Sequence, residues 1–141
     1  GSPDHRGVPG APGRVATLVR CPGEICGGCA YRVEEDVDAI LAELDAREQA
    51  GFQRARIPVL PAPAEPAFAE ALAWVADETN AHFLGEADDA SLAAHVAQSR
   101  GPSGSNVEYV LRLRDALAAL AIRDAHVERI ADLVGDTSAR V

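Results

Sequence analysis

Residues 34–48 read EEDVDAILAELDARE, and this stretch gives the clearest structural signal in the 141-residue sequence. Apolar side chains recur at Val37, Ile40, Leu41 and Leu44, which is the spacing of a helix that buries one face. Acidic residues fill most of the other positions, and those at the start are favoured by the helix dipole. We therefore predict an amphipathic helix from Glu34 to about Glu48.

Segments rich in β-branched and small apolar residues lie on both sides of this helix and predict strands. A Pro-Gly turn at Pro22 and Gly23 separates two such segments before the helix, which predicts a strand pair. After the helix, a proline-rich loop separates two more, and Trp74 is expected in the core beneath the second. The expected strands are 14–19, 25–33, 52–60 and 69–76.

The second half of the sequence predicts helices. Ser105 and Glu108 form an S-x-x-E capping box ahead of the longest apolar-periodic segment. Strands in the first half and helices in the second predict an α+β domain. Two further helices are expected, one from Asp88 or Asp89 to Gly101 and one capped by Asp124.

Composition fits a single globular domain, because 141 residues with 48% hydrophobic content can bury a core. We expect an extended, Pro- and Gly-rich lead-in at residues 1–13 and one domain over residues 14–141. The net charge is −9 and the 13 Lys and Arg residues are scattered, which argues against a nucleic-acid partner. No apolar run approaches the ~20 residues of a membrane span and no signal sequence is evident, so we expect a cytoplasmic protein without a membrane partner.

Glu48 is the catalytic candidate that physical chemistry alone singles out. It continues the apolar stripe of the predicted helix by one more four-residue step, so its side chain is expected to point inward. At a helix C-terminus, the dipole and burial both raise a carboxyl pKa, and a general base or acid needs such a shift. The alternative is a helix that ends at Ala46 and a surface ion pair with Arg47, Arg54 or Arg56.

Cys26 and Cys29 form a C-x-x-C motif, with Cys21 nearby. An odd cysteine count without a secretory signal argues against a disulfide framework. Redox pairs use a helix N-terminus to lower the thiol pKa, whereas the residues after Cys29 predict a strand. A structural zinc site needs a second ligand pair, and the four histidines show no ligand spacing. Thiol redox chemistry or metal binding therefore has the poorest support.

Five blocks of the sequence, in order and in register, together resemble ChaC-type γ-glutamylcyclotransferases. Each block alone is a weak signal, but the set of five is specific and extends over nearly the whole chain. The blocks are residues 4–7 (DHRG), 12–19 (PGRVATLV), 28–31 (GCAY), 44–52 (LDAREQAGF) and 101–110 (GPSGSNVEYV).

The resemblance implies a mixed fold with a small, barrel-like sheet and flanking helices, and an enzyme that splits glutathione into 5-oxoproline and Cys-Gly without cofactor or metal. The catalytic glutamate of the family falls on Glu48, which shifts the balance toward the catalytic interpretation of that residue. Arg6 is in the first block and is a candidate to pair with a substrate carboxylate. Tyr109 is a candidate to line the site or to bond to the substrate.

The sequence also departs from the family pattern. The family begins with a strand that leads into a Tyr-Gly-Ser-Leu loop, whose N–H groups cradle the γ-glutamyl arm, and these 141 residues contain neither. Gly27 stands in place of a tryptophan, and Ala50-Gly51-Phe52 stands in place of Gly-Gly-Tyr. We therefore expect an N-terminally truncated chain in which the base is present and the cradle is not.

Two functions stay open from the sequence. The first is an active cyclotransferase with a small γ-glutamyl substrate, and the second is an inactive remnant or a γ-glutamyl-binding module without the substrate loop. Absence of the first strand would also leave a sheet edge unpaired, which predicts self-association.

Overall fold

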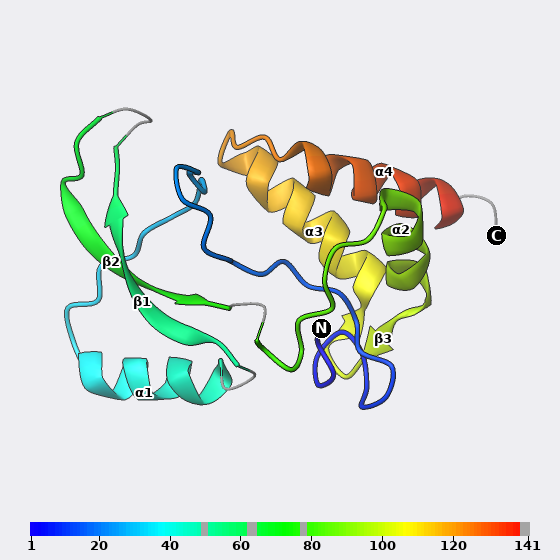
Figure 1. Cartoon of the computed structure of the whole chain (residues 1–141), viewed down its shortest axis with the longest axis horizontal. Helices are drawn as coiled ribbons and strands as arrows, with labels where there is room; N and C mark the ends of the chain where they lie inside the picture. The colour runs from blue at the N-terminus through cyan, green and yellow to red at the C-terminus, as the bar shows by residue number, and fades with distance from the viewer. Residues whose placement is uncertain (49–50, 62–64, 77–78, 139–141) are drawn as a thin grey trace. The chain divides into compact units, whose positions relative to one another are not determined.

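The computed structural model describes residues 1–48, 51–61, 65–76 and 79–138 (Figure 1). These residues fold into two compact units, one formed by Gly1–Ala16 with Leu84–Val141 and one formed by Thr17–Phe83. Helices occur together with short antiparallel strands, which confirms the predicted α+β class. No helix in the described part of the chain has the length and apolar character needed to cross a membrane.

The unit formed by residues 17–83 contains one helix and one antiparallel ribbon (Figure 1). The helix α1 covers Val37–Arg47, and the strands are β1, Gln53–Val59, and β2, Ala69–Val75. All three elements agree with the predicted segments to within a few residues. Arg54 lies directly opposite Trp74 in the ribbon, so their side chains project from the same face.

The predicted strand pair before α1 is wrong. Residues 20–36 form neither helix nor strand, and the only β pairing described for residues 14–19 is an isolated bridge between Val19 and Ala76. Ile25 is 56% exposed and Tyr31 is 87% exposed. A strand requires a partner edge and a buried face, and a two-stranded hairpin is only marginally stable without them. The β-branched composition of this segment was therefore not sufficient to form a strand.

The other unit is a bundle of three helices, α2, α3 and α4 (Figure 1). Their bounds are Asp89–Gln98, Asn106–Ala119 and Ala125–Ser138. The apolar core between them consists of Ala93, Val96, Val110, Ile130, Ala131 and Val134.

The three predicted helix starts are confirmed by side-chain caps. Asp88 accepts a hydrogen bond from the Ser91 N–H, and Ser105 accepts one from the Glu108 N–H. Asp124 accepts from the N–H groups of residues 126 and 127. The end of α2 differs from the prediction: the helix stops at Gln98 because the next residues form the short hairpin of β3, Arg100–Gly101, and β4, Gly104–Ser105.

Residues 1–16 fold back along the helical bundle. Ser2 and Gly13 exchange backbone hydrogen bonds of 2.8 and 3.0 Å, which closes a loop near β3 (Figure 1). Gly101 permits the close approach of this segment, because a Cβ there would lie 2.2 Å from the carbonyl oxygen of His5. Two of the five sequence blocks, 4–7 and 101–110, are therefore in direct contact.

Candidate active site

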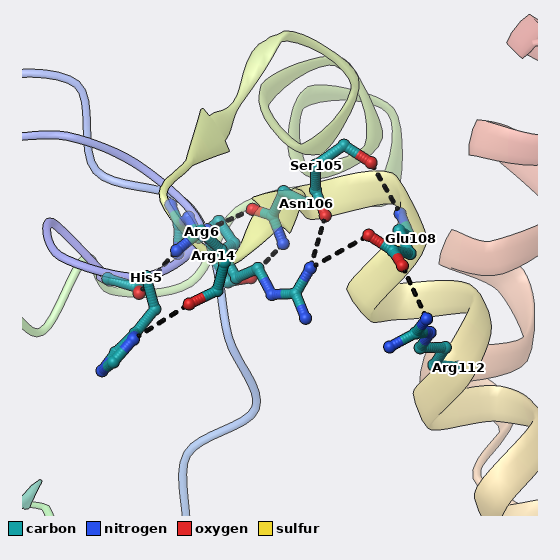
Figure 2. Close-up of polar contacts among 9 residues, drawn as sticks. His5, Arg6, Arg14, Ser105, Asn106, Glu108 and Arg112 are labelled. Atoms are coloured by element: carbon teal, nitrogen blue, oxygen red, sulfur yellow. Dashed lines mark hydrogen bonds and ion pairs between the residues drawn. The ribbon is translucent and has the colours of Figure 1, made fainter.

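Arg6 lies against the first turn of α3 (Figure 2). Its Nη1 donates to the carbonyl oxygen of Ser105 at 3.1 Å and to Oε2 of Glu108 at 3.4 Å. The guanidinium also lies over the ring of Tyr109, 5.6 Å from the ring centre. Only 15% of the Arg6 side chain is exposed. The structure therefore brings together Arg6 and Tyr109, two of the three predicted site residues.

Glu108 connects Arg6 to the helix. Its carboxylate bonds to Arg6 and, one turn further along α3, to Nη2 of Arg112 at 2.8 Å (Figure 2). The capping box therefore provides the Ser105 cap, while the Glu108 carboxylate makes ion pairs with two arginines. Gly104 has φ of 107°, and a Cβ at this position would lie 2.5 Å from Oε2 of Glu108. A side chain at this position would therefore displace the ion pair.

Asn106 and Tyr109 hold the segment 14–16 against α3. The side chain of Asn106 is fully buried; its Oδ1 accepts from the Arg14 N–H at 2.5 Å and its Nδ2 donates to the Arg14 carbonyl at 2.6 Å. The hydroxyl of Tyr109 accepts from the Ala16 N–H at 3.0 Å. Asn106 and Tyr109 are three residues apart and lie on one face of α3. Side chains on one face of α3 therefore hold residues 14–16 through hydrogen bonds to their backbone.

Burial raises the pKa of the Tyr109 hydroxyl above its ordinary value, and the bond from Ala16 offsets only part of this effect. The phenol is therefore neutral at physiological pH and can both accept and donate a hydrogen bond. Asn106 was not singled out from the sequence. The available signal was its place in the 101–110 block, directly after the cap residue.

Glu48 ends α1. Its N–H bonds to the Leu44 carbonyl at 2.9 Å, and its Oε1 accepts from Nε of Arg47 at 3.1 Å. The side chain of Glu48 is 26% exposed and that of Arg47 is 65% exposed. The structure combines features of the two interpretations of Glu48. The helix continues one residue past Ala46 and the carboxylate is half-buried, as the catalytic interpretation expects. The carboxylate also pairs with Arg47, as the surface-pair interpretation expects.

The C-x-x-C motif is exposed and lies apart from regular structure. Cys21, Cys26 and Cys29 are all free thiols at the surface. The first helix begins only at Val37, so the motif does not stand at the N-terminus of α1, the helix that follows it in the sequence. Among the residues that the structure describes, no group of three or more His, Cys, Asp or Glu side chains is arranged to hold a metal ion.

We expect all three thiols of the native protein to react rapidly with an aromatic disulfide reagent such as DTNB, because each cysteine is exposed. Absorbance of the released thiolate, measured without denaturant, would count the reactive thiols. Slow reaction until denaturant is added would contradict the exposed placement of this segment.

Residues 1–137 match the family model described as ChaC-like protein. The chain belongs to the ChaC-like family. A relative from Arabidopsis thaliana named γ-glutamylcyclotransferase 2-3 is 36% identical over 141 residues, which cover 95% of the ChaC-like chain and 71% of the relative. A human relative, glutathione-specific γ-glutamylcyclotransferase 1, is 37% identical over 136 residues, which cover 93% of the chain and 61% of the relative. The chain thus spans about three fifths of the human protein.

Solved structures support the same fold. Two crystal structures of a yeast γ-glutamylcyclotransferase specific to glutathione superpose on the ChaC-like chain with TM-scores of 0.78 and 0.76. Each superposition covers 96% of this chain and 80% or 83% of the yeast chain, at 22% and 24% sequence identity. The resemblance inferred from the five blocks is therefore confirmed at the level of family and fold.

Proposed function

We propose that this ChaC-like chain is a γ-glutamylcyclotransferase that converts glutathione into 5-oxoproline and Cys-Gly. The observation that carries the proposal is Glu48, a half-buried carboxylate at the end of α1 in the 44–52 block. The names of the plant and human relatives support the reaction and, for the human protein, the substrate. We also propose a cytoplasmic location, where thiols such as that of glutathione are kept reduced.

The reaction needs one carboxyl group because the substrate carries its own nucleophile. The α-amine of the γ-glutamyl residue attacks the γ-carbonyl carbon, so that a five-membered lactam ring forms. Glu48 takes a proton from the α-ammonium group as the attack begins, and the attacking nitrogen loses a second proton as the lactam forms. Both protons pass to the Cys-Gly nitrogen, one of them through Glu48, so that Cys-Gly departs as an ammonium as the amide bond breaks. Proton, leaving group and charge balance without a nucleophilic side chain.

Arg6 and Tyr109 are the proposed substrate-binding residues. A guanidinium recognises a carboxylate through parallel N–H bonds, and glutathione carries two carboxylates. In this role Arg6 would exchange Glu108 for a substrate carboxylate, or would bind the substrate with the donors that face away from Glu108. The neutral phenol of Tyr109 is suited to a hydrogen bond with a substrate amide or carboxylate.

We further propose that the β1–β2 ribbon supports self-association, because an edge strand offers unpaired N–H and C=O groups to another chain. Light scattering across a concentration series is expected to show dimers or larger species. A strictly monomeric protein at high concentration would contradict this part of the proposal.

Blocking the α-amine tests the proposed reaction. Glutathione is expected to yield Cys-Gly, whereas N-acetyl-glutathione is expected to yield none, because its acetylated nitrogen cannot attack the γ-carbonyl. Liquid chromatography of the products would measure both. The assay should use the 141-residue chain and, in parallel, the protein with any residues that its gene encodes before Gly1. Release of Cys-Gly from the blocked substrate would indicate hydrolysis and contradict cyclisation.

A further inference from the structure

The helix that carries Glu48 has little apolar anchoring. None of the α1 residues, all of which the structure describes, is buried, and Val37 at its start is 42% exposed. The N-cap residue Asp36 has a left-handed backbone with φ of 50°, and no side-chain cap bond is described for it. Ile40, Leu41 and Leu44 are only partly buried, so apolar burial gives α1 a weak anchor and polar contacts contribute to its position on the ribbon.

A polar cluster of Asp45, Arg54 and Trp74 joins α1 to the ribbon. Oδ1 of Asp45 accepts from Nε1 of Trp74 at 2.9 Å and from Nε of Arg54 at 3.2 Å, while Oδ2 accepts from Nη2 of Arg54. The Arg54 guanidinium also lies over the indole ring, 5.9 Å from its centre. Because Arg54 and Trp74 are opposite each other on β1 and β2, a single carboxylate contacts both strands.

The geometry of this cluster restricts how α1 can move. A guanidinium that binds both oxygens of a carboxylate fixes the plane of the carboxylate. The indole N–H of Trp74 adds a third hydrogen bond, which comes from the other strand. Asp45 precedes Glu48 by three residues, so the two side chains lie on the same side of the helix, ~4.5 Å apart along its axis. A rotation or shift of α1 that breaks the cluster would carry Glu48 with it.

We propose that Asp45, held by Arg54 and Trp74, is a positioning residue that places the Glu48 carboxylate for proton transfer. This inference rests on the proposed function of Glu48. The bond from Arg54, followed by that from Trp74, lowers the pKa of Asp45 below its ordinary value, so the carboxylate stays charged across the neutral range. Proton transfer requires heavy atoms within hydrogen-bond reach, and a misplacement of ~1 Å can cost ~10²-fold in rate.

One substitution tests the cluster through kinetics. Asp45→Asn removes the charge but keeps the shape of the side chain. We expect kcat for Cys-Gly release to fall ~10-fold or more in Asp45→Asn, with KM changed less than ~2-fold, because the substrate-binding groups are untouched. The matched control is Arg56→Gln, which breaks the exposed pair of Arg56 with Glu70 on the same ribbon and should leave both constants unchanged.

A second readout does not depend on activity. Trp74 is the only tryptophan in the chain, so intrinsic fluorescence reports directly on the cluster. Asp45→Asn is expected to shift the emission and to speed hydrogen exchange at the Glu48 amide, whereas Arg56→Gln should do neither. Wild-type kcat in Asp45→Asn, or unchanged emission and exchange, would overturn the positioning role. A wild-type protein that does not act on glutathione would instead contradict the proposed function, and the exchange measurement would still decide whether Asp45 holds α1.

Discussion

Replacement of Glu48 by glutamine is expected to reduce the release of Cys-Gly from glutathione by about 10²- to 10⁴-fold, the contribution of a positioned general base. Glutamine keeps the size of the side chain and can still accept the bond from Nε of Arg47. It cannot take a proton from the α-ammonium group of the substrate. The loss should therefore appear in kcat, while KM and the unfolding temperature should stay close to those of the wild type.

The matched control is Glu43→Gln, which removes an exposed carboxylate from the same helix. This variant should keep wild-type activity, because nothing in the proposed reaction uses Glu43. Full activity in the Glu48→Gln variant would show that another group moves the proton. Loss of circular-dichroism signal in Glu48→Gln would indicate a folding defect. In that case the residual activity of Glu48→Asp, which keeps the charge on a shorter side chain, would decide whether the carboxylate at position 48 is the general base.

Truncation of Asn106 to alanine is expected to cost about 2 to 4 kcal/mol in the free energy of unfolding. The buried amide of Asn106 bonds to both the N–H and the C=O of Arg14, at 2.5 and 2.6 Å. Alanine would leave these two backbone groups without their partners, and each such loss costs about 1 to 3 kcal/mol when the group is shielded from water. Urea unfolding followed by circular dichroism would measure the change as a lower midpoint.

Ser103→Ala provides the control for this prediction. The Ser103 hydroxyl bonds to the His5 ring at 3.2 Å, but this contact is exposed, so its loss should cost less than about 0.5 kcal/mol. An Asn106→Ala variant as stable as the Ser103→Ala variant would contradict the conclusion that the Asn106 amide holds residues 14–16 on the helical bundle.

Local signals in the sequence predicted the helices well. The caps at Asp88, Ser105 and Asp124 depend on a side chain and the backbone two or three residues later, so sequence spacing is enough to identify them. The two strands after α1 were also predicted, because their turn-bounded apolar composition coincides with an actual partner strand.

Non-local structure was harder to predict. Residues 25–33 have strand composition, but the structure pairs them with no neighbouring strand among the residues that it describes. Composition reports what a segment can do, whereas the availability of a partner edge decides what it does. The close packing of Gly101 on the His5 carbonyl likewise depends on chain segments nearly a hundred residues apart.

The candidate site was only partly predictable, because several of its contacts are also non-local. Glu48 could be found because helical periodicity and the family blocks converge on one residue. Asp45 borders the apolar stripe but does not continue it, so a solvated carboxylate is the ordinary expectation there, and its partners Arg54 and Trp74 are brought to it only by the ribbon. Arg6 was selected as a substrate ligand, and its contacts with Glu108 and Tyr109 became visible only in the structure.

The products formed from glutathione distinguish cyclisation of the γ-glutamyl residue from hydrolysis of its amide bond. Mass spectrometry of the reaction mixture is expected to show 5-oxoproline and Cys-Gly in equal amounts, with no free glutamate, because the α-amine and not water displaces Cys-Gly. The measurement should be made on the 141-residue chain and, in parallel, on the protein with any residues that its gene encodes before Gly1. Formation of free glutamate, or the absence of both products in both reactions, would contradict the assignment of this chain as a glutathione cyclotransferase.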